Sequence, residues 1–134
     1  MEFMHGLQIG ISLLQTISQS QKWLFLVSPY LKPWDELLNS IIDASHRRVA
    51  VTLVLRGAEM RAENEKLSKP LADRGVTIKF LDRLHAKLYV NESQAVVTSM
   101  NLHKESLLDS WEAAVVLNGQ QDRDGYEKVL SALR

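Results

Sequence analysis

The order of the apolar segments constrains the fold of this chain more than any other feature. Three short apolar runs, typical of buried strands, alternate with segments in which apolar residues recur at helical spacing. The runs lie at residues 23–27, 49–55 and 76–81, and the helical segments begin near Leu7, Pro33 and Ala58. This alternation favours an α/β sheet with helices on both faces. If these strands are parallel, the loops that follow them lie at one edge, where ligands tend to bind.

The second half of the chain has a different pattern. Two strand-like segments, residues 85–90 and 95–99, are separated only by Asn91-Glu92-Ser93, which is short enough for a hairpin. A last apolar strand is expected at 112–117 and a closing amphipathic helix at 122–133. The chain has no linker, repeat or low-complexity tract, and its 134 residues suit one domain. We therefore expect a single α/β domain over residues 1–134, built on a mixed sheet.

Composition narrows the possible functions. The chain has no cysteine, which excludes disulfides, thiolate metal sites and cysteine nucleophiles. Its 16 basic and 16 acidic side chains give a formal net charge of zero, whereas a strongly basic domain would have indicated nucleic-acid binding. Any site for an anion must therefore be local.

The sequence indicates no membrane partner. Its apolar runs are well below the ~20 residues that a spanning helix needs. Residues 1–20 lack the basic start of a signal peptide. We expect a soluble, cytoplasmic protein.

Polar side chains gather on one face of the predicted hairpin. Side chains alternate between the two faces of a strand, so His85, Lys87 and Tyr89 point the same way. Ser99 and Asn101 likewise share a face, and an antiparallel return would bring them back beside His85 and Lys87. The result is an imidazole, an ammonium, a hydroxyl and a carboxamide. This set offers one nucleophile or acid and three donors suited to phosphate oxygens.

The same residues resemble a known family. His85-Ala86-Lys87 and Thr98-Ser99-Met100-Asn101 resemble the HKD motif of the phospholipase D superfamily. Two further features fit that family: Glu112 in SWEAAVV, and Ser28-Pro29-Tyr30 after a strand near the N-terminus. The resemblance implies a phospholipase D/nuclease-like fold.

Two positions depart from the family pattern. The family usually has Asp five residues after the Lys, where this chain has Glu92, or Asn91 if one residue is deleted. We prefer the alignment with one residue deleted, in which Asn91 takes the place of the Asp. It keeps the usual six residues before the second part of the motif, Thr98-Ser99-Met100-Asn101. In the family this Asp is thought to support structure more than chemistry. The other departure is Thr98, which stands where the family has Gly and would narrow the approach of the backbone to a ligand.

The resemblance also implies a mechanism. The chain has one HKD copy, and single-copy members resemble small bacterial nucleases that form homodimers with a composite site on the two-fold axis. His85 of one subunit would form a phosphohistidine, and His85 of the other would act as acid and then base. Lys87, Ser99 and Asn101 would bind the phosphoryl oxygens, and Glu112 would orient the His85 ring. Neither a metal nor a cofactor is implied.

Three functions remain open at this point. The leading hypothesis is a metal-independent phosphodiesterase that acts as a DNA or RNA nuclease. The second is a catalytically weakened phosphate-binding, nucleic-acid-binding or assembly module. The third is a phospholipase or phosphatidyl transferase. Structural explanations also exist, because Ser99 and Asn101 belong to residue types that often end strands and Glu112 could be a solvated strand end.

Overall fold

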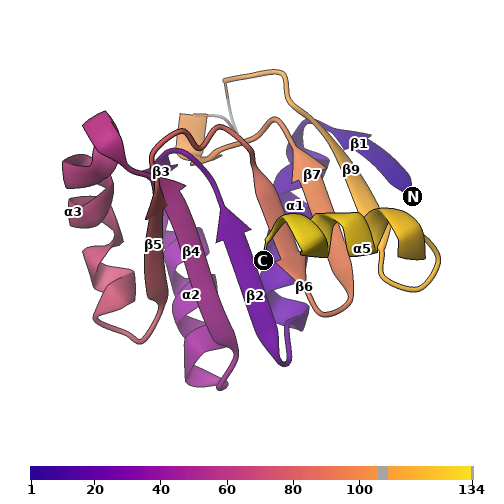
Figure 1. Cartoon of the computed structure of the whole chain (residues 1–134), viewed down its shortest axis with the longest axis horizontal. Coiled ribbons are helices and arrows are strands. Elements are labelled where there is room, and N and C mark those ends of the chain that lie inside the picture. Colours follow the sequence, from indigo (N-terminus) through magenta and orange to yellow (C-terminus); the bar gives the residue numbers. More distant parts are fainter. Residues whose placement is uncertain (106–108, 134) are drawn as a thin grey trace.

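The computed structural model describes residues 1–105 and 109–133, and a mixed sheet forms its centre (Figure 1). Within these residues the sheet has seven strands, ordered β1-β9-β7-β6-β2-β4-β5. Their bounds, in chain order, are β1 Glu2–His5, β2 Trp23–Val27, β4 Ala50–Arg56, β5 Thr77–Leu81, β6 Leu88–Asn91, β7 Gln94–Thr98 and β9 Ala113–Asn118. A separate parallel pair joins β3 Leu31–Lys32 to β8 Leu102–His103. The predicted mixed sheet is confirmed.

One half of the sheet is parallel. Strand β2 pairs with β4, and β4 pairs with β5, all in the same direction. Their carboxyl ends therefore meet at one edge, the upper edge in Figure 1. On one face of these strands, residues such as Leu24, Leu26 and Leu53 are fully buried. The apolar runs that predicted these strands thus reflect burial against a core.

The other half of the sheet is antiparallel. Strand β6 pairs with both β2 and β7, β7 also pairs with β9, and β1 closes the sheet beside β9. The predicted hairpin is confirmed, but its first strand begins at Leu88, and residues 84–87 lie in the loop before it. The sequence pattern does not predict strand β1, because four residues at a sheet edge with one buried side chain leave no readable alternation.

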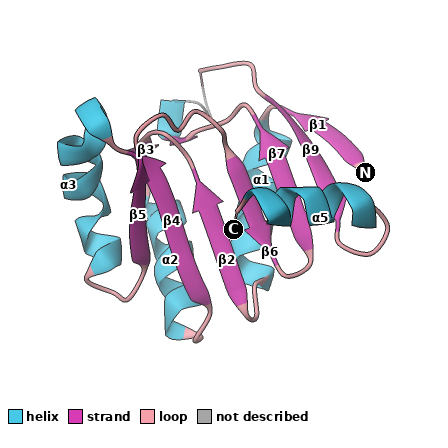
Figure 2. Cartoon of the chain, viewed as in Figure 1, coloured by secondary structure: helices cyan, strands magenta, loops and turns pink. Residues whose placement is uncertain are grey.

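Helices cover both faces of the sheet (Figure 2). Three helices pack their buried residues into the main core on one face: α1 Leu7–Gln19, α2 Asp35–His46 and α3 Arg61–Ala72. Helix α5 Arg123–Ala132 lies on the opposite face, where Tyr126 packs with Val90 and Ala95. Helix α5 crosses β6, β7 and β9 and leaves much of β4 and β5 uncovered on its side (Figure 2).

The helix boundaries correct two details of the prediction. Helix α2 begins at Asp35, after Trp34 as its N-cap, so Pro33 precedes the helix instead of forming its first residue. Helix α3 follows a short 3₁₀ turn, Ala58–Met60, and includes Pro70 two residues before its end. The turn after α3 needs Gly75, whose φ of +96° lies in the left-handed region that favours glycine.

No helix in the described part of the chain is both long enough and apolar enough to span a membrane.

Candidate active site

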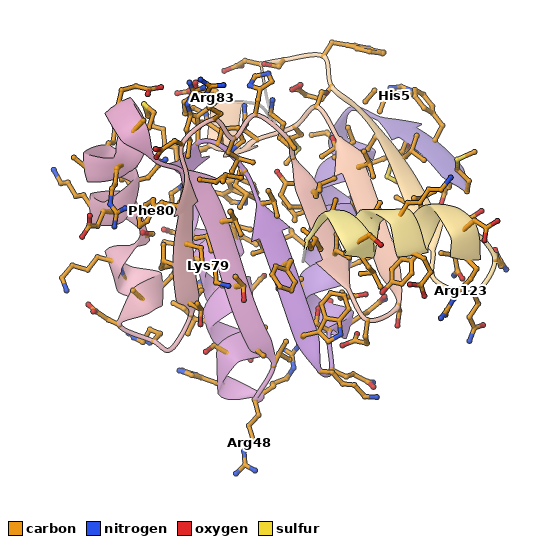
Figure 3. All side chains as sticks on the ribbon, in the orientation of Figure 1. His5, Arg48, Lys79, Phe80, Arg83 and Arg123 are labelled. Atoms are coloured by element: carbon orange, nitrogen blue, oxygen red, sulfur yellow. The ribbon has the colours of Figure 1, made fainter. Side chains whose placement is uncertain are left out.

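The predicted site residues gather at the edge where the parallel strands end. The chain enters this edge from β5, passes through residues 82–87 and leaves along β6. It returns to the edge at the end of β7 and again at the start of β9. Figure 3 shows Arg83 at this edge, at the opposite end of the molecule from Arg48. The topology thus brings residues 85, 99, 101 and 112 to one end of the sheet, as a parallel core predicts.

His85 and Lys87 meet in the loop before β6. The Lys87 Nζ atom lies 3.4 Å from Nε2 of His85. The His85 side chain is exposed, so a substrate can reach the ring. An ammonium beside a reactive imidazole nitrogen is an arrangement that can hold a phosphoryl oxygen while the nitrogen attacks phosphorus.

Ser99 and Glu112 form a second pair beside them. The Ser99 hydroxyl donates to Oε1 of Glu112 at 2.9 Å, and the Ala113 N–H donates to Ser99 Oγ at 3.2 Å. The Thr98 N–H donates to the Lys87 carbonyl at 3.3 Å, which places the return strand alongside the His/Lys segment. Among the described residues Glu112 makes no hydrogen bond to His85. Its predicted role in orienting that ring stays a prediction.

Asn101 occupies a different position from the other motif residues. It is half-buried and lines a pocket of about 370 Å³ between α3 and the β3–β8 pair. Its Oδ1 atom is buried and has no hydrogen-bond partner within the described residues. The structure therefore places His85 with Lys87 and Ser99 with Glu112, whereas Asn101 lines a pocket to which none of those four residues contributes.

A buried polar framework holds the segment that carries Asn101. The Tyr89 hydroxyl donates to the Met100 carbonyl, and the Ser28 hydroxyl accepts from the Leu102 N–H at 3.0 Å. The same Ser28 hydroxyl donates to the Tyr30 carbonyl at 2.7 Å. Burial raises the pKa of Tyr89 well above its ordinary value, so its hydroxyl stays a neutral donor. Tyr89 thus holds the backbone before Asn101, and Ser28 holds the backbone after it.

Tyr89 does not share an exposed face with His85 and Lys87, contrary to the simple alternation. Its side chain is completely buried in the main core. The alternation applies only from Leu88 onward, where regular pairing begins. His85 and Lys87 precede the strand, so their common direction comes from the loop.

Asn91, which stands where the family has Asp, has a structural role. Asn91 is 1% exposed, and its Oδ1 accepts from the N–H groups of Ser93 and Gln94 at 2.8 and 3.0 Å. Its Nδ2 donates to the Thr16 carbonyl at 2.9 Å, which ties the hairpin turn to α1. Asn91 ends β6, at the opposite end of the strand from His85. The neighbouring Glu92 accepts from three backbone N–H groups, those of residues 21–23.

One buried polar residue on the pocket beside Asn101 was not predicted from the sequence. Asn64 is 1% exposed on α3, and its Nδ2 donates to the carbonyls of Pro29 and Arg56 at 2.9 Å each. Its spacing from Ser68 and Leu71 places it on the buried face of α3, since residues four and seven apart share a helix face. A polar residue at a core-facing position was the available signal.

His103, two residues after Asn101, faces a carboxylate. It belongs to β8, and its Nδ1 lies 3.0 Å from a carboxylate oxygen of Glu105. Lys32 reaches the other oxygen of that carboxylate at 3.2 Å. Within the described residues, no three His, Asp or Glu side chains cluster as a metal site would require.

The fold and this edge define a class of protein: mixed α/β domains of the phospholipase D type. A family model described as "Cardiolipin synthase, PLD-like domain" matches residues 13–134. The chain therefore belongs to this phospholipase D-like family, whose members cleave or transfer phosphodiesters. The suspected relationship to the phospholipase D superfamily is confirmed.

Individual relatives agree with this assignment. Cardiolipin synthase A of Buchnera aphidicola subsp. Baizongia pistaciae is 28% identical over 114 residues, which are 80% of this chain and 23% of that protein. The chain thus spans about a quarter of this relative. Nuc of Salmonella typhimurium, a phospholipase D family member, has a TM-score of 0.78 at 17% identity, covering 98% of this chain and 90% of Nuc. NucT of Helicobacter pylori has a TM-score of 0.71 at 15% identity, with 97% of each chain covered.

Proposed function

We propose that this chain is a metal-independent phosphodiesterase that hydrolyses nucleic acid through a phosphohistidine at His85. The observation that carries the proposal is the contact between His85 Nε2 and Lys87 Nζ, at 3.4 Å, on an exposed loop. It joins a nucleophile to a cation that can bind a phosphoryl oxygen. The Ser99–Glu112 pair adds a hydroxyl at the same edge.

The proposed reaction has two steps. His85 of one subunit attacks phosphorus, the bond to the leaving oxygen breaks, and His85 of the second subunit gives that oxygen a proton. The second histidine then takes a proton from water, the water oxygen attacks phosphorus, and the phosphorus–nitrogen bond breaks. Lys87 and Asn101 stabilise the charge that shifts onto the phosphoryl oxygens, and Ser99 does so once its hydroxyl proton turns from Glu112 to the substrate.

An apolar surface beside His85 supports the homodimer that this reaction requires. A pocket of about 400 Å³ lies between the end of α5, at Ala132 and Leu133, and the neighbouring strands. Its sheet wall is mainly apolar, with Leu81 56% exposed, and it includes one exposed cation, Lys79. The apolar residues there include Phe25, Val54, Leu81, Leu84 and Ala86. Leu84 and Ala86 flank His85 in the chain, so a second copy seated on this surface would approach the site. Burying exposed apolar area is the usual driving force for such an association.

The substrate assignment rests on the single HKD motif and on a local cation. Single-motif chains of this type resemble small bacterial nucleases, and Arg83 lies exposed at the same edge as His85. Because binding to nucleic acid depends on neutralising phosphates, the affinity should fall steeply as salt is raised. Binding that persists in molar salt would contradict a nucleic-acid substrate.

A phosphatidyl transferase is the second candidate, and the match to cardiolipin synthase A favours it. In that case an alcohol replaces water in the second step. Supplying RNA, DNA and phosphatidylglycerol vesicles in parallel distinguishes the two, since each activity yields a different product.

The decisive experiment compares two histidines. Hydrolysis of bis(p-nitrophenyl) phosphate in EDTA should fall at least about a hundredfold in His85→Ala, the loss typical of removing a catalytic acid, base or nucleophile. His46→Ala is the matched control, because His46 is exposed in the last turn of α2, and it should keep the wild-type rate. Equal rates in wild type and His85→Ala would leave only the non-catalytic module.

A further inference from the structure

The loop that carries His85 and Lys87 is held at its first residue by a neighbouring turn. That residue is Asp82, which follows β5, and its Oδ1 atom accepts a hydrogen bond from the Ala58 N–H at 3.0 Å. Ala58 opens the 3₁₀ turn between β4 and α3. The bond therefore joins two segments that are 24 residues apart in the chain.

This turn is attached to the centre of the parallel strands. The Gly57 N–H donates to the Leu81 carbonyl at 3.1 Å, and the Met60 N–H donates to the Gly57 carbonyl at 3.0 Å. Strand β4, which leads into the turn, lies between β2 and β5 and pairs with both. The Ala58 N–H thus offers Asp82 a donor whose position is set by the sheet.

Two local features show that the turn is shaped around the Asp82 carboxylate. A Cβ atom on Gly57 would lie 2.5 Å from Oδ1 of Asp82, so a larger residue there would displace the carboxylate. Ala58 has a φ of +48°, in the left-handed region that is unfavourable for a residue with a side chain. Such a conformation persists only where its surroundings hold it, and the bond to Asp82 is one such hold.

The position of the His85 ring depends on how its loop is anchored. In the described part of the chain, the one hydrogen-bond contact of the imidazole is with Lys87, which belongs to the same loop. Beyond Asp82 the loop has two further anchors. Leu84 is 6% exposed, and the Lys87 carbonyl accepts from the Thr98 N–H at 3.3 Å. The ring is therefore positioned through the backbone of residues 82–87.

We propose that Asp82 is a positioning residue for the reaction at His85. By holding the first residue of the loop against the β4–α3 turn, Asp82 favours the loop conformation in which Lys87 reaches Nε2 of His85. The proposal rests on the function proposed above, in which the His85 ring attacks phosphorus. Small displacements of a reacting group lower rates strongly, so an anchor outside the reacting groups affects turnover.

Three substitutions change this hydrogen bond in different ways. Asp82→Ala removes the acceptor, Gly57→Ala presses on the carboxylate, and Asp82→Asn keeps an oxygen that can accept from the Ala58 N–H. We expect kcat for bis(p-nitrophenyl) phosphate to fall about tenfold in Asp82→Ala and Gly57→Ala, because displaced loop conformations compete with the reactive one. In Asp82→Asn, kcat should stay within about twofold of the wild-type value, because the hydrogen bond is kept.

Asp73→Ala is the matched control. Asp73 is an exposed carboxylate at the C-cap of α3, at the other end of that helix from the turn, and its removal should leave kcat unchanged. Urea denaturation measures the global stability of each variant. Hydrogen exchange of residues 82–87 measures the order of the loop itself. Exchange there should be faster in Asp82→Ala and Gly57→Ala, and should match wild type in Asp82→Asn and Asp73→Ala.

The outcomes separate the anchoring of the loop from the chemistry. Wild-type kcat in folded Asp82→Ala overturns the positioning role, and so does an equal fall in Asp82→Ala and Asp82→Asn, because charge would then be responsible. If Asp82→Ala does not fold, Gly57→Ala decides in its place. If the wild-type protein hydrolyses no phosphodiester, the proposed function fails, and the NMR signals of the His85 ring decide the anchoring. A shift of those signals in Asp82→Ala that Asp82→Asn restores supports it, and unchanged signals overturn it.

Discussion

Asn91 uses both ends of its amide, which explains why an amide is suitable at this position. Its oxygen accepts from the turn residues Ser93 and Gln94, as a carboxylate could. Its nitrogen donates to the Thr16 carbonyl, which a carboxylate could not do. An Asn in place of the family Asp therefore suits a site where α1 offers a carbonyl acceptor. This site lies at the end of β6 away from the reacting groups.

Asn91→Asp should destabilise the protein. A buried carboxylate would face the Thr16 carbonyl and lose the two hydrogen bonds that Nδ2 donates to Thr16 and Ser20. We therefore expect a loss of about 2–4 kcal/mol in the free energy of unfolding. Urea denaturation measures it. Asn39→Asp, on the exposed surface of α2, is the control and should change stability little. A fully stable Asn91→Asp would show that the turn accepts either side chain.

Because Tyr89 is buried as a neutral phenol, we expect the folded protein to lose stability in alkali. Its pKa is raised by burial above the ordinary value of 10.0, and burial also raises the pKa of Tyr126. Below pH 10 both folded and unfolded chains keep the phenol protons. Above pH 10 the unfolded chain loses them first, so the stability that these neutral tyrosines contribute declines as pH rises.

The size of this effect can be measured by substitution. The free energy of unfolding should fall above about pH 10 by up to about 1.4 kcal/mol per pH unit for each such tyrosine. Tyr89→Phe should be less stable at pH 7, because the Met100 carbonyl loses its donor, and its decline in alkali should be shallower. A wild-type slope that Tyr89→Phe reproduces in full would contradict the assignment to Tyr89.

At the scale of elements, the site depends on how the end of β2 is joined to β8. Strand β8 has only two residues and pairs with an equally short β3. The Ser28 hydroxyl connects the two segments by accepting from Leu102 and donating to Tyr30. This contact orders the chain next to Asn101.

Ser28→Ala should therefore affect both stability and turnover. Removing the hydroxyl deprives two buried backbone groups of partners, and we expect a loss of about 2 kcal/mol. The kcat for a phosphodiester should fall several-fold as Asn101 loses its fixed position. Ser40→Ala is the control, since Ser40 makes one local bond to Glu36 in α2. Unchanged kcat in Ser28→Ala would mean that β8 positions Asn101 without this hydroxyl.

At the scale of the whole molecule, the uncovered part of the sheet is the feature that bears on assembly. Helix α5 crosses the antiparallel half of its face. Phe25, Val54 and Leu81 remain partly exposed and line one pocket together with Ala86, the neighbour of His85 in the chain. A second copy on this surface would give the composite site that the proposed reaction needs.

If the proposed dimer forms on this surface, Leu81→Arg should give a monomer and remove activity, because a charge would replace an apolar contact between the two copies. Sedimentation or light scattering measures the oligomeric state. Leu7→Arg is the control, since Leu7 is similarly exposed, 63% against 56%, but lies on α1. A wild-type monomer with full activity would overturn the dimer.

Mixed dimers test whether two histidines share one site. Wild-type and His85→Ala subunits, mixed equally and allowed to exchange, should retain about a quarter of the activity, because only wild-type pairs hold both histidines. If each subunit had its own independent site, the mixture would retain about half of the activity, because half of the subunits are wild type. The two results are distinguishable in a simple titration of one subunit against the other.

Much of this architecture was readable from the sequence. The apolar runs located β2 and β4, because strands inside a parallel sheet are largely apolar, and the alternation of half-buried and exposed residues located β5 at the sheet edge. The spacing of Tyr126, Val129 and Leu130 located α5, because those residues share the buried face of the helix. The HKD resemblance named His85, Lys87, Ser99, Asn101 and Glu112.

The tertiary structure decided what each of these residues contacts. Short elements such as β1, β3 and β8 exist because of partners distant in the chain, which local patterns do not contain. The pairing of Ser99 with Glu112, the buried Tyr89 and the pocket at Asn64 likewise depend on segments brought together by the sheet. Local periodicity determined the elements, and the residue types determined the chemistry available. Only the packing of distant segments determined which groups meet, because that depends on contacts between residues far apart in sequence.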